Sequence, residues 1–242
     1  MLELNCTYAH YVEGKGVESV QIQLLYTVAD DEGNEELMYY GFITEEGSAT
    51  YQDEPYCWVI DPLDGTTNYI HDEAPYCVCI ALRSRTELLL GVVYEVCRDE
   101  CFCAWRGGRA FMNGEEIHVS GVRDIKDAFV FAELPYNAQQ YKQTALHLID
   151  KLYGVVGGIR MNGSAAAAIC YVAMGRFDAW AEAFLGKWDY SAAALIVQEA
   201  GGRVTDFCGN GHFMDGHHII ATNGYLHSVY QQLIAEVPPL DM

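Results

Sequence analysis

Asp61 and Asp64 stand three residues apart in the segment WVIDPLDGTTNYIH, residues 58–71. The hydrophobic residues before Asp61 favour a strand that aims the first carboxylate past the edge of a sheet. Pro62 fixes φ beside it, so the chain turns on a preset path that brings Asp64 back toward Asp61. Two carboxylates held close repel each other unless they share a proton or a cation. This pair is a candidate oxygen-ligand site for Mg²⁺.

The residues after the second aspartate could bind an anion. Gly65, Thr66 and Thr67 suit a tight turn that leads into a helix. Free N–H groups at the start of a helix attract phosphate, which would then lie against the metal. Taken alone, the segment fits equally well a plain β-turn at Asp64-Gly65, with Asp61 as a helix cap.

Acids elsewhere in the sequence shift that balance. They are Glu45 and Glu46 after a short apolar stretch, Glu182 at the end of an expected strand, and Asp189 at the start of an expected helix. In isolation, the glutamate pair would be a solvated loop and Asp189 a partner of the helix dipole. Acids that recur at the ends of expected elements favour a metal site built from several segments.

The charge of the chain bears on its partners. Its 242 residues include 34 acidic and 14 basic ones, for a formal net charge of −20. So acidic a surface repels phosphate backbones and anionic lipids, which argues against nucleic acid and membranes as partners. An anionic substrate would need local positive charge, and bound metal cations would supply it.

The nine cysteines lie mostly in apolar, strand-like runs such as YCVCIAL and ECFCAW. The first residues lack a basic start and a sustained apolar stretch, so no secretory signal is expected. Reduced thiols in a cytoplasmic protein are the better interpretation. The pairs at Cys77 and Cys79 and at Cys101 and Cys103 could be imagined as a zinc site, but small buried hydrophobic residues are favoured.

The elements that position these residues are strands first and alternating strands and helices later. We expect strands at 56–60, 76–82, 88–96, 101–106, 128–134, 155–161, 177–183, 203–206 and 218–222. We expect helices at 137–153, 163–175, 187–202 and 225–236. Residues 1–40 are the least legible part, with a strand near 20–28 and one helical turn at 35–39. This order predicts a mixed α/β (α+β) sandwich with a boundary between about 125 and 155.

Three segments together resemble the inositol monophosphatase family. They are Glu45-Glu46, then WVIDPLDGTTNYIH, then GKWDYSAAALIVQEAGG, in the family's order and at similar separations. The forms D-P-[IL]-D-G-T-T-N and W-D-x-[AS]-A-[AG] are the two sequence signatures of the family, and the resemblance covers about residues 41–236. It implies one domain over 1–242 with the layered αβαβα sandwich of the sugar phosphatases. Its sub-layers would be an antiparallel-sheet half with the metal-binding loops, about 1–135, and an α/β half, 136–242.

The resemblance also implies a Mg²⁺-dependent, lithium-sensitive phosphomonoesterase, usually a homodimer. Two Mg²⁺ ions are expected per site, and the family has a third, weaker one. The implied metal ligands are Glu45, Asp61, the Leu63 carbonyl, Asp64 and Asp189, with Asp61 shared. The implied catalytic residues are Glu45, Thr66 and Asp61, of which Thr66 and Glu45 would orient and deprotonate the attacking water. The implied substrate-binding residues are Asp64, Gly65, Thr66, Gly163, Ser164, Ala165, Glu182 and Asp189.

The expected reaction is hydrolysis of a small phosphate ester of a polyol or sugar, with myo-inositol 1-phosphate the best single guess. The sister group of 3′(2′),5′-bisphosphate nucleotidases tends to carry Lys-Glu after D-G-T, whereas this chain has Thr67-Asn68. Fructose-1,6-bisphosphatase activity is a further alternative in the same superfamily. An alternative of another class is a catalytically weakened regulatory or binding protein.

The N-terminal part departs from the family pattern. Family members begin with about two helices before the first glutamate ligand, but only 44 residues precede Glu45 and they do not read as two amphipathic helices. Asp30 or Asp31 could match a family acid near the third metal, and Lys15 is a weak match for a nearby lysine. The departure bears on the third metal and on lid closure, and it leaves the two signatures untouched.

Overall fold

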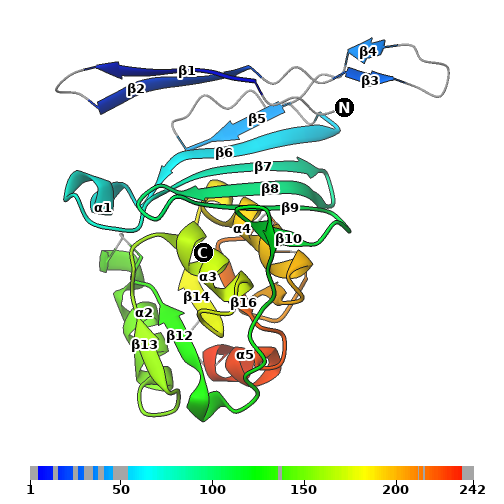
Figure 1. The fold of residues 1–242 in the computed structure, drawn as a ribbon. Coiled ribbons are helices and arrows are strands. Elements are labelled where there is room, and N and C mark those ends of the chain that lie inside the picture. Colours follow the sequence, from blue (N-terminus) through cyan, green and yellow to red (C-terminus); the bar gives the residue numbers. More distant parts are fainter. Residues whose placement is uncertain are drawn as a thin grey trace.

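The structure is a computed structural model in which side chains are described for residues 41–45, 54–135, 141–211, 213–214 and 216–235. For residues 5–12, 16–23, 27–29, 35–37 and 138–140 it describes the backbone alone. Two larger sheets and the helices around them make up the described part (Figure 1).

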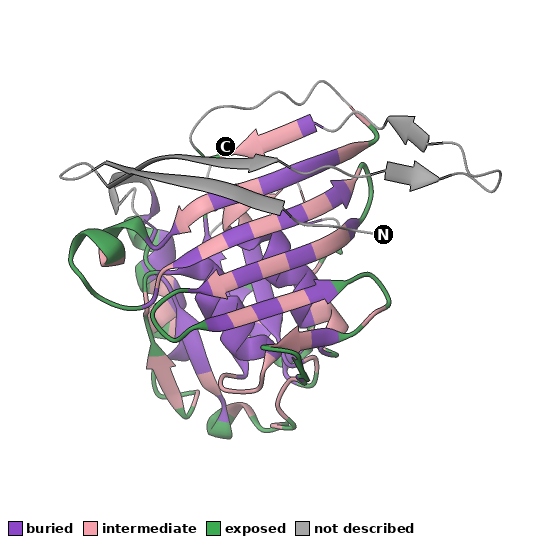
Figure 2. Cartoon of the chain, turned by 45° about the horizontal axis from the view of Figure 1, so that its top comes forward, coloured by how far each residue is buried: buried purple, intermediate pink, exposed green. Residues whose placement is uncertain are grey.

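The first sheet has seven strands in the order β11-β10-β9-β8-β7-β6-β5. Their bounds are β5 Gly41–Thr44, β6 Tyr56–Asp64, β7 Cys77–Ser84, β8 Leu88–Glu95, β9 Glu100–Trp105, β10 Ala110–Met112 and β11 Glu115–Glu116. Neighbours are antiparallel except β5 and β6, which are parallel. Buried and half-buried residues alternate along β7, as the period of a pleated strand requires (Figure 2). One face of this sheet therefore carries the core.

The second sheet has five strands in the order β13-β12-β14-β16-β15. Their bounds are β12 Phe129–Ala132, β13 Gly158–Arg160, β14 Ala179–Ala183, β15 Arg203–Asp206 and β16 His218–Thr222. β12 runs parallel to β13 and β14, whereas β16 is antiparallel to both of its neighbours. The mixed α/β fold expected from the sequence is confirmed.

The helices divide between two layers. α3 (Ala165–Ala173) and α4 (Lys187–Glu199) lie between the two sheets, and α2 (Ala138–Leu152) and α5 (His227–Ala235) lie on the outer face of the smaller one (Figure 1). The short elements are α1 (Thr66–Ile70) after β6 and a 3₁₀ turn at Ile125–Asp127. Among the described helices, none lies on the other face of the seven-stranded sheet, where an αβαβα sandwich has its first helical layer.

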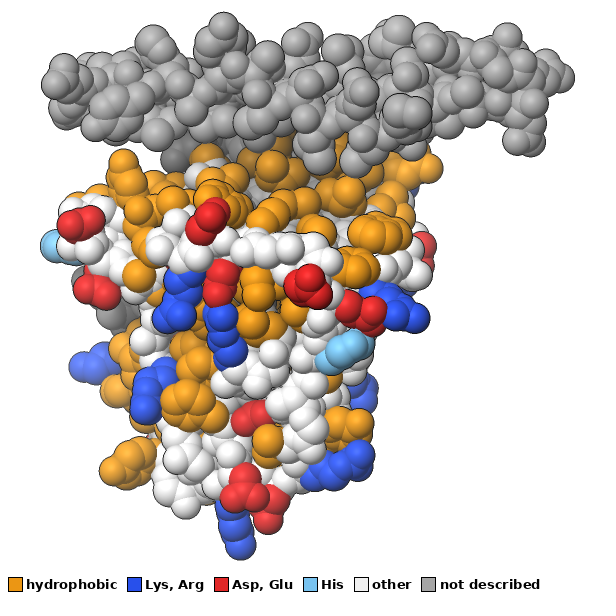
Figure 3. Space-filling view, in the orientation of Figure 1, with side chains coloured by type: hydrophobic (Ala, Val, Ile, Leu, Met, Phe, Trp, Pro, Cys, Tyr) orange, Lys and Arg blue, Asp and Glu red, His pale blue; other side chains and the backbone are white. Residues whose placement is uncertain are grey.

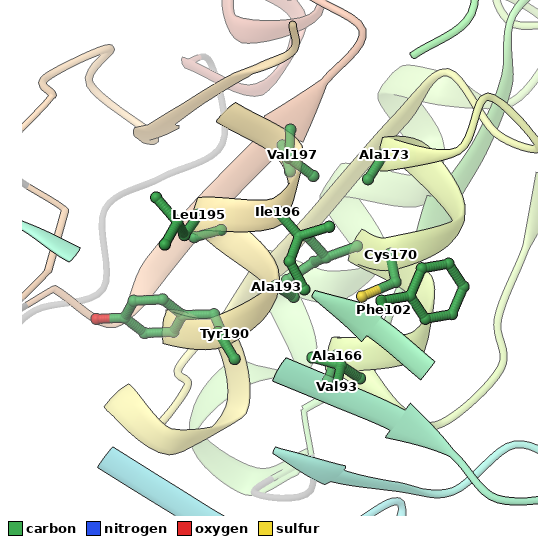
Figure 4. Packing of buried hydrophobic residues seen from close by; sticks show 14 of the residues in the cluster. Val93, Phe102, Ala166, Cys170, Ala173, Tyr190, Ala193, Leu195, Ile196 and Val197 are labelled. Atoms are coloured by element: carbon green, nitrogen blue, oxygen red, sulfur yellow. The ribbon is translucent and has the colours of Figure 1, made fainter. Parts of the chain in front are cut away.

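The inner helices are largely buried because both sheets enclose them. Every residue of α3 is buried, and eight consecutive residues of α4, Tyr190–Val197, are buried too. Such a pattern is expected of a helix inside a core. Figure 4 shows the two helices packing against each other and against Val93 and Phe102 of the large sheet. This packing determines where the N-termini of both helices lie relative to the large sheet.

Two turns follow the local sequence. Asn113 and Gly114 both have positive φ, 51° and 85°, in the connection between β10 and β11. Gly175, with φ 75°, follows the C-cap of α3 and ends that helix. Both positions favour residues that adopt the left-handed region at low cost.

Three predictions about local structure in the segments up to β6 differ from the structure. The helical turn expected at 35–39 is replaced by strand β4 (Glu35–Leu37), because this segment pairs with β3 (Thr27–Ala29) and pairing overrides weak helix propensity. The strand predicted to stop at residue 60 continues through both aspartates to Asp64. Of the strand expected near 20–28, the described residues belong to β2 (Gly16–Gln23), which pairs with β1 (Asn5–Val12), and to β3.

The visible surface carries mixed charge. On the face shown in Figure 3, basic side chains lie among acidic and hydrophobic ones and form no continuous basic area. Within the described segments, none of the helices combines the length and the apolar character that a membrane crossing requires.

Candidate active site

Three aspartates lie close together where the seven-stranded sheet meets the helices enclosed between the two sheets. Asp61 and Asp64 come from β6, and Asp189 comes from the first turn of α4. One carboxylate oxygen of each lies within 4.8 Å of one of each of the others. Asp61 is 1% exposed and Asp64 7%, so water screens their charges poorly. In the part of the chain with described side chains, no other group of three potential metal ligands is this close.

An irregularity in the strand pairing places both β6 aspartates on one side. Asp61 pairs with Cys79 and Asp64 with Cys77, so three steps along β6 match two along β7. The extra residue bulges out of the ladder. The Leu63 amide donates to Asp61 Oδ1 at 2.8 Å and fixes the bulge from inside. A regular strand would point residues three apart to opposite faces.

The crowding of the three acids shows in their pKa values. Burial, with the charges of Asp64 and Glu45, raises the pKa of Asp61 to about 9. Burial and the charge of Asp64 raise the pKa of Asp189 to about 7. The pKa of Asp64 is raised by burial to about 6, and hydrogen bonds from Ser164 and Ala166 limit the increase. A cation at this point would remove the penalty for ionising all three.

The donor set fits Mg²⁺. All three groups are carboxylates, and hard oxygen ligands are those that Mg²⁺ prefers. Of the thiols considered as zinc ligands, Cys77 and Cys79 are buried and Cys101 and Cys103 half-buried, and all four are free. None of them belongs to a cluster of metal-ligand type.

Glu45 lies beside the triad without joining its tight cluster. It follows the last residue of β5, Thr44, which pairs with Ile60 next to Asp61. Its side chain is exposed, and its charge raises the pKa of all three aspartates. Glu46, Asp30, Asp31 and Lys15 lie outside the described residues.

The turn after β6 lies close to two backbone carbonyl groups, those of Leu63 and Pro75. Thr66 Oγ1 donates to the Leu63 carbonyl at 2.9 Å. Gly65 has φ 86°, and a Cβ there would lie 2.8 Å from the Pro75 carbonyl oxygen. Glycine is required at this position for its conformation and for the close approach of the backbone.

The start of α3 is tied directly to the triad. The Ser164 hydroxyl donates to Asp64 Oδ2 and accepts from the Ala167 amide at 3.2 Å, so it caps the helix. The Ala166 amide donates to the same Asp64 oxygen at 3.0 Å. Gly163 precedes this cap with φ 74°, and Ala165 is buried. These contacts join α3 to a strand about 100 residues earlier in the chain.

Two more glutamates lie close to the cluster. Glu182, near the end of β14, is 9% exposed, and burial with the charges of Glu133, Asp189 and Asp64 raises its pKa. Burial also raises the pKa of Glu133 to about 7, against the hydrogen bonds that it accepts from the Asn162 and Gly163 amides.

Sequence reasoning missed Glu133 and Asn68. Glu133 directly follows strand β12. Asp61 and Asp189 were likewise expected at the ends of elements, so the same pattern could have indicated Glu133. Asn68 contacts a segment 94 residues away, which no local pattern indicates.

The chain is similar in sequence to proteins of one family. The family model described as "Inositol monophosphatase family" matches residues 29–238. A protein named Nus factor SuhB from Pseudomonas aeruginosa is 43% identical over 185 residues, 76% of this chain and 67% of that protein. An inositol-1-monophosphatase from Mesorhizobium japonicum is 36% identical over 185 residues, 76% of this chain and 70% of that protein.

Solved structures of similar proteins share the fold. The inositol monophosphatase from Anabaena superposes with a TM-score of 0.79 at 33% identity, covering 83% of this chain and 80% of that one. The extragenic suppressor protein suhB from Bartonella henselae gives 0.77 at 35% identity, covering 81% of this chain and 76% of that one.

Proposed function

The chain belongs to the inositol monophosphatase family, and we propose that it hydrolyses myo-inositol 1-phosphate to inositol and phosphate in a Mg²⁺-dependent reaction. The observation that carries the proposal is the triad of buried Asp61 and Asp64 with half-buried Asp189, whose pKa values are all raised by burial and neighbouring charges. Such a cluster is costly to keep unless it serves a cation. Family membership makes a phosphomonoester the substrate class.

The ligand set follows from the positions of the acids. Glu45, Asp61 and the Leu63 carbonyl would hold one Mg²⁺, and Asp61, Asp64 and Asp189 a second. When bound, such ions lower the pKa of a bound water and stabilise the charges of attacking and leaving oxygens. The protein itself contributes alignment, which is most of what phosphoryl transfer asks of it.

The chain's own groups would orient the water and the ester. The Thr66 hydroxyl proton is engaged with Leu63, so its oxygen is left to accept a hydrogen bond from the attacking water. Glu45 is exposed beside the triad and would take up the proton. The Gly65 and Thr66 amides would hold phosphate oxygens. The residues that would contact the polyol are Gly163, Ser164, Ala165 and Glu182.

A second candidate function is a regulatory one. Relatives at 41–43% identity carry the name Nus factor SuhB, which favours a binding role that does not depend on turnover. The two candidate functions differ in what they require of Asp61. Hydrolysis needs the charge of its carboxylate, whereas a binding role does not.

Asp61→Asn separates them. We expect this variant to lose roughly three orders of magnitude or more in Mg²⁺-dependent phosphate release, because the carboxylate that would serve both metal positions loses its charge. The measurement uses a panel of esters that includes myo-inositol 1-phosphate, a 3′,5′-bisphosphate nucleotide and fructose 1,6-bisphosphate, with and without Li⁺. Asp150→Asn makes the same change at an exposed position of α2 and serves as the control.

Thermal unfolding gives a second measurement of the same variant. Mg²⁺ should raise the melting temperature of the wild type and of Asp150→Asn, and leave Asp61→Asn unchanged. Absence of turnover by the wild type on every ester at millimolar Mg²⁺ would favour the regulatory function instead.

A further inference from the structure

Asn68 joins two turns that come from opposite halves of the chain. It lies in α1, directly after the turn Gly65-Thr66. Its side-chain Nδ2 donates to the Pro75 carbonyl at 2.8 Å and to the Asn162 carbonyl at 2.7 Å. One amide group therefore bonds both the loop that follows α1 and the segment that leads into α3.

Gly163 lies against this side chain, at a position where a larger residue would not fit. A Cβ on Gly163 would lie 2.9 Å from Asn68 Oδ1 and 3.2 Å from Nδ2. Contacts under 3.0 Å force a shift of one partner, so the absence of a side chain at Gly163 allows Asn68 to pack directly on the backbone. The two turns are in contact through this pair.

The segment before α3 is held from its other side as well. Glu133 accepts from the Asn162 amide at 3.0 Å and from the Gly163 amide at 3.3 Å. Asn162 Oδ1 accepts from the Ser164 amide at 3.1 Å. The position of this segment is thus defined by β12 on one side and by Asn68 on the other. Two links join it to the end of β6 and the turn that follows: the Ser164 hydroxyl bonds Asp64 in the strand, and Asn68 bonds the Asn162 carbonyl from α1.

We propose that Asn68 is a positioning residue that, together with the bond between Ser164 and Asp64, sets the separation between the phosphate-binding turn, Gly65-Thr66, and the polyol-binding turn, Gly163–Ala165. The inference rests on the proposed function. An ester whose alcohol part reaches the second turn while its phosphate lies on the first needs this separation. A phosphate without a large alcohol part touches only the first turn and does not need it.

The experiment compares Asn68→Ala with wild type on ligands of two sizes. We expect KM for myo-inositol 1-phosphate to rise roughly tenfold, since the bond to Asn162 that holds the second turn is lost together with the bond to Pro75 that anchors Asn68. The inhibition constant of inorganic phosphate should change by less than about twofold. Ile70→Ala, on the same helix at a side chain that is 71% exposed, should leave both constants unchanged.

A purely structural role of Asn68 would weaken both ligands by the same factor, and that result overturns the proposal. So does a result in which neither constant changes. Asn68→Asp, which keeps the shape and sets a carboxylate against two carbonyl oxygens, should raise KM further than Asn68→Ala. A wild type without turnover would overturn the proposed function itself, whereas equal losses in an active enzyme overturn only the role of Asn68.

A double-mutant cycle tests the contact without turnover. In metal-free protein, Gly163→Ala should lower the melting temperature less in the Asn68→Ala background than in the wild type, because the clashing atom is gone and only the strain of positive φ remains. Equal losses in both backgrounds would show that the two side chains do not meet, and would overturn the proposal.

Discussion

At the scale of single residues, one hydroxyl group serves two structures at once. Ser164 caps α3 through the Ala167 amide and donates its own proton to Asp64. A buried hydroxyl with both kinds of partner costs little to bury, and it keeps a buried carboxylate from being isolated. The hydroxyl therefore links the start of α3 to the triad, beside the bond that the Ala166 amide donates to Asp64.

Removing that hydroxyl should cost more than an ordinary helix cap. For Ser164→Ala we expect a loss of about 1–3 kcal/mol in unfolding free energy, because a cap is lost and Asp64 loses a donor. Urea unfolding of the metal-free protein measures it. Ser191→Ala is the matched control, since its equally buried hydroxyl bonds only the Lys187 carbonyl of its own helix. A loss no larger than that of the control would contradict the expectation.

At the scale of elements, the close packing of α4 on the large sheet holds Asp189 near β6. Gly91 of β8 faces the helix, and a Cβ there would lie 2.4 Å from the Ala192 carbonyl oxygen. Since that oxygen belongs to the helix backbone, it cannot rotate away. The distance between sheet and helix depends on this glycine. The distance from Asp189 on α4 to the two aspartates of β6 depends on it too.

Gly91→Ala should push α4 away from the sheet. We expect a destabilisation of about 1–3 kcal/mol, as for other overpacked cores, together with a weaker stabilising effect of Mg²⁺. Differential scanning calorimetry with and without Mg²⁺ tests both parts. Gly121→Ala, at a glycine with open space around it, should be close to neutral. If the two variants melted alike, the close approach would not matter for stability.

The same scale shows what the sequence could and could not predict. Period and turn residues indicated nearly every strand and helix from residue 56 onward, because these signals are local. The bulge at Pro62-Leu63 was not predicted, since register depends on the partner strand β7. Glu133 carried a visible signal at the end of β12. The reach of Asn68 carried none, because its partner Asn162 is distant in the chain.

At the scale of the whole molecule, opposing groups set how stability depends on pH. The triad acids have raised pKa values, so the folded state keeps their protons to higher pH than the unfolded state does. The repulsion between these acids therefore decreases as pH falls, which favours the folded state. His227 acts in the other direction. It is 2% exposed between Thr205 and Thr222, and burial with the charge of Arg203 lowers its pKa from 6.5 to about 4.

A depressed histidine pKa gives stability that is present above 6.5 and is lost as pH falls toward 4, because only the unfolded chain takes up the proton there. From about pH 7.5 to 4.5, the wild type should therefore lose more unfolding free energy than His227→Gln, which cannot titrate. Urea titrations in the presence of a chelator measure the difference between the two proteins, so the acids common to both cancel. Parallel pH profiles would show that His227 does not contribute.

The bond between Ser164 and Asp64 also bears on how the protein is made. The two residues are 100 positions apart, and Asp189 comes later still. While the chain leaves the ribosome, β6 emerges with its two acids long before the helices that complete their surroundings. A nascent chain that ends before Asp189 lacks the third carboxylate, so the three-carboxylate site that we propose for Mg²⁺ can form only after that residue has been made.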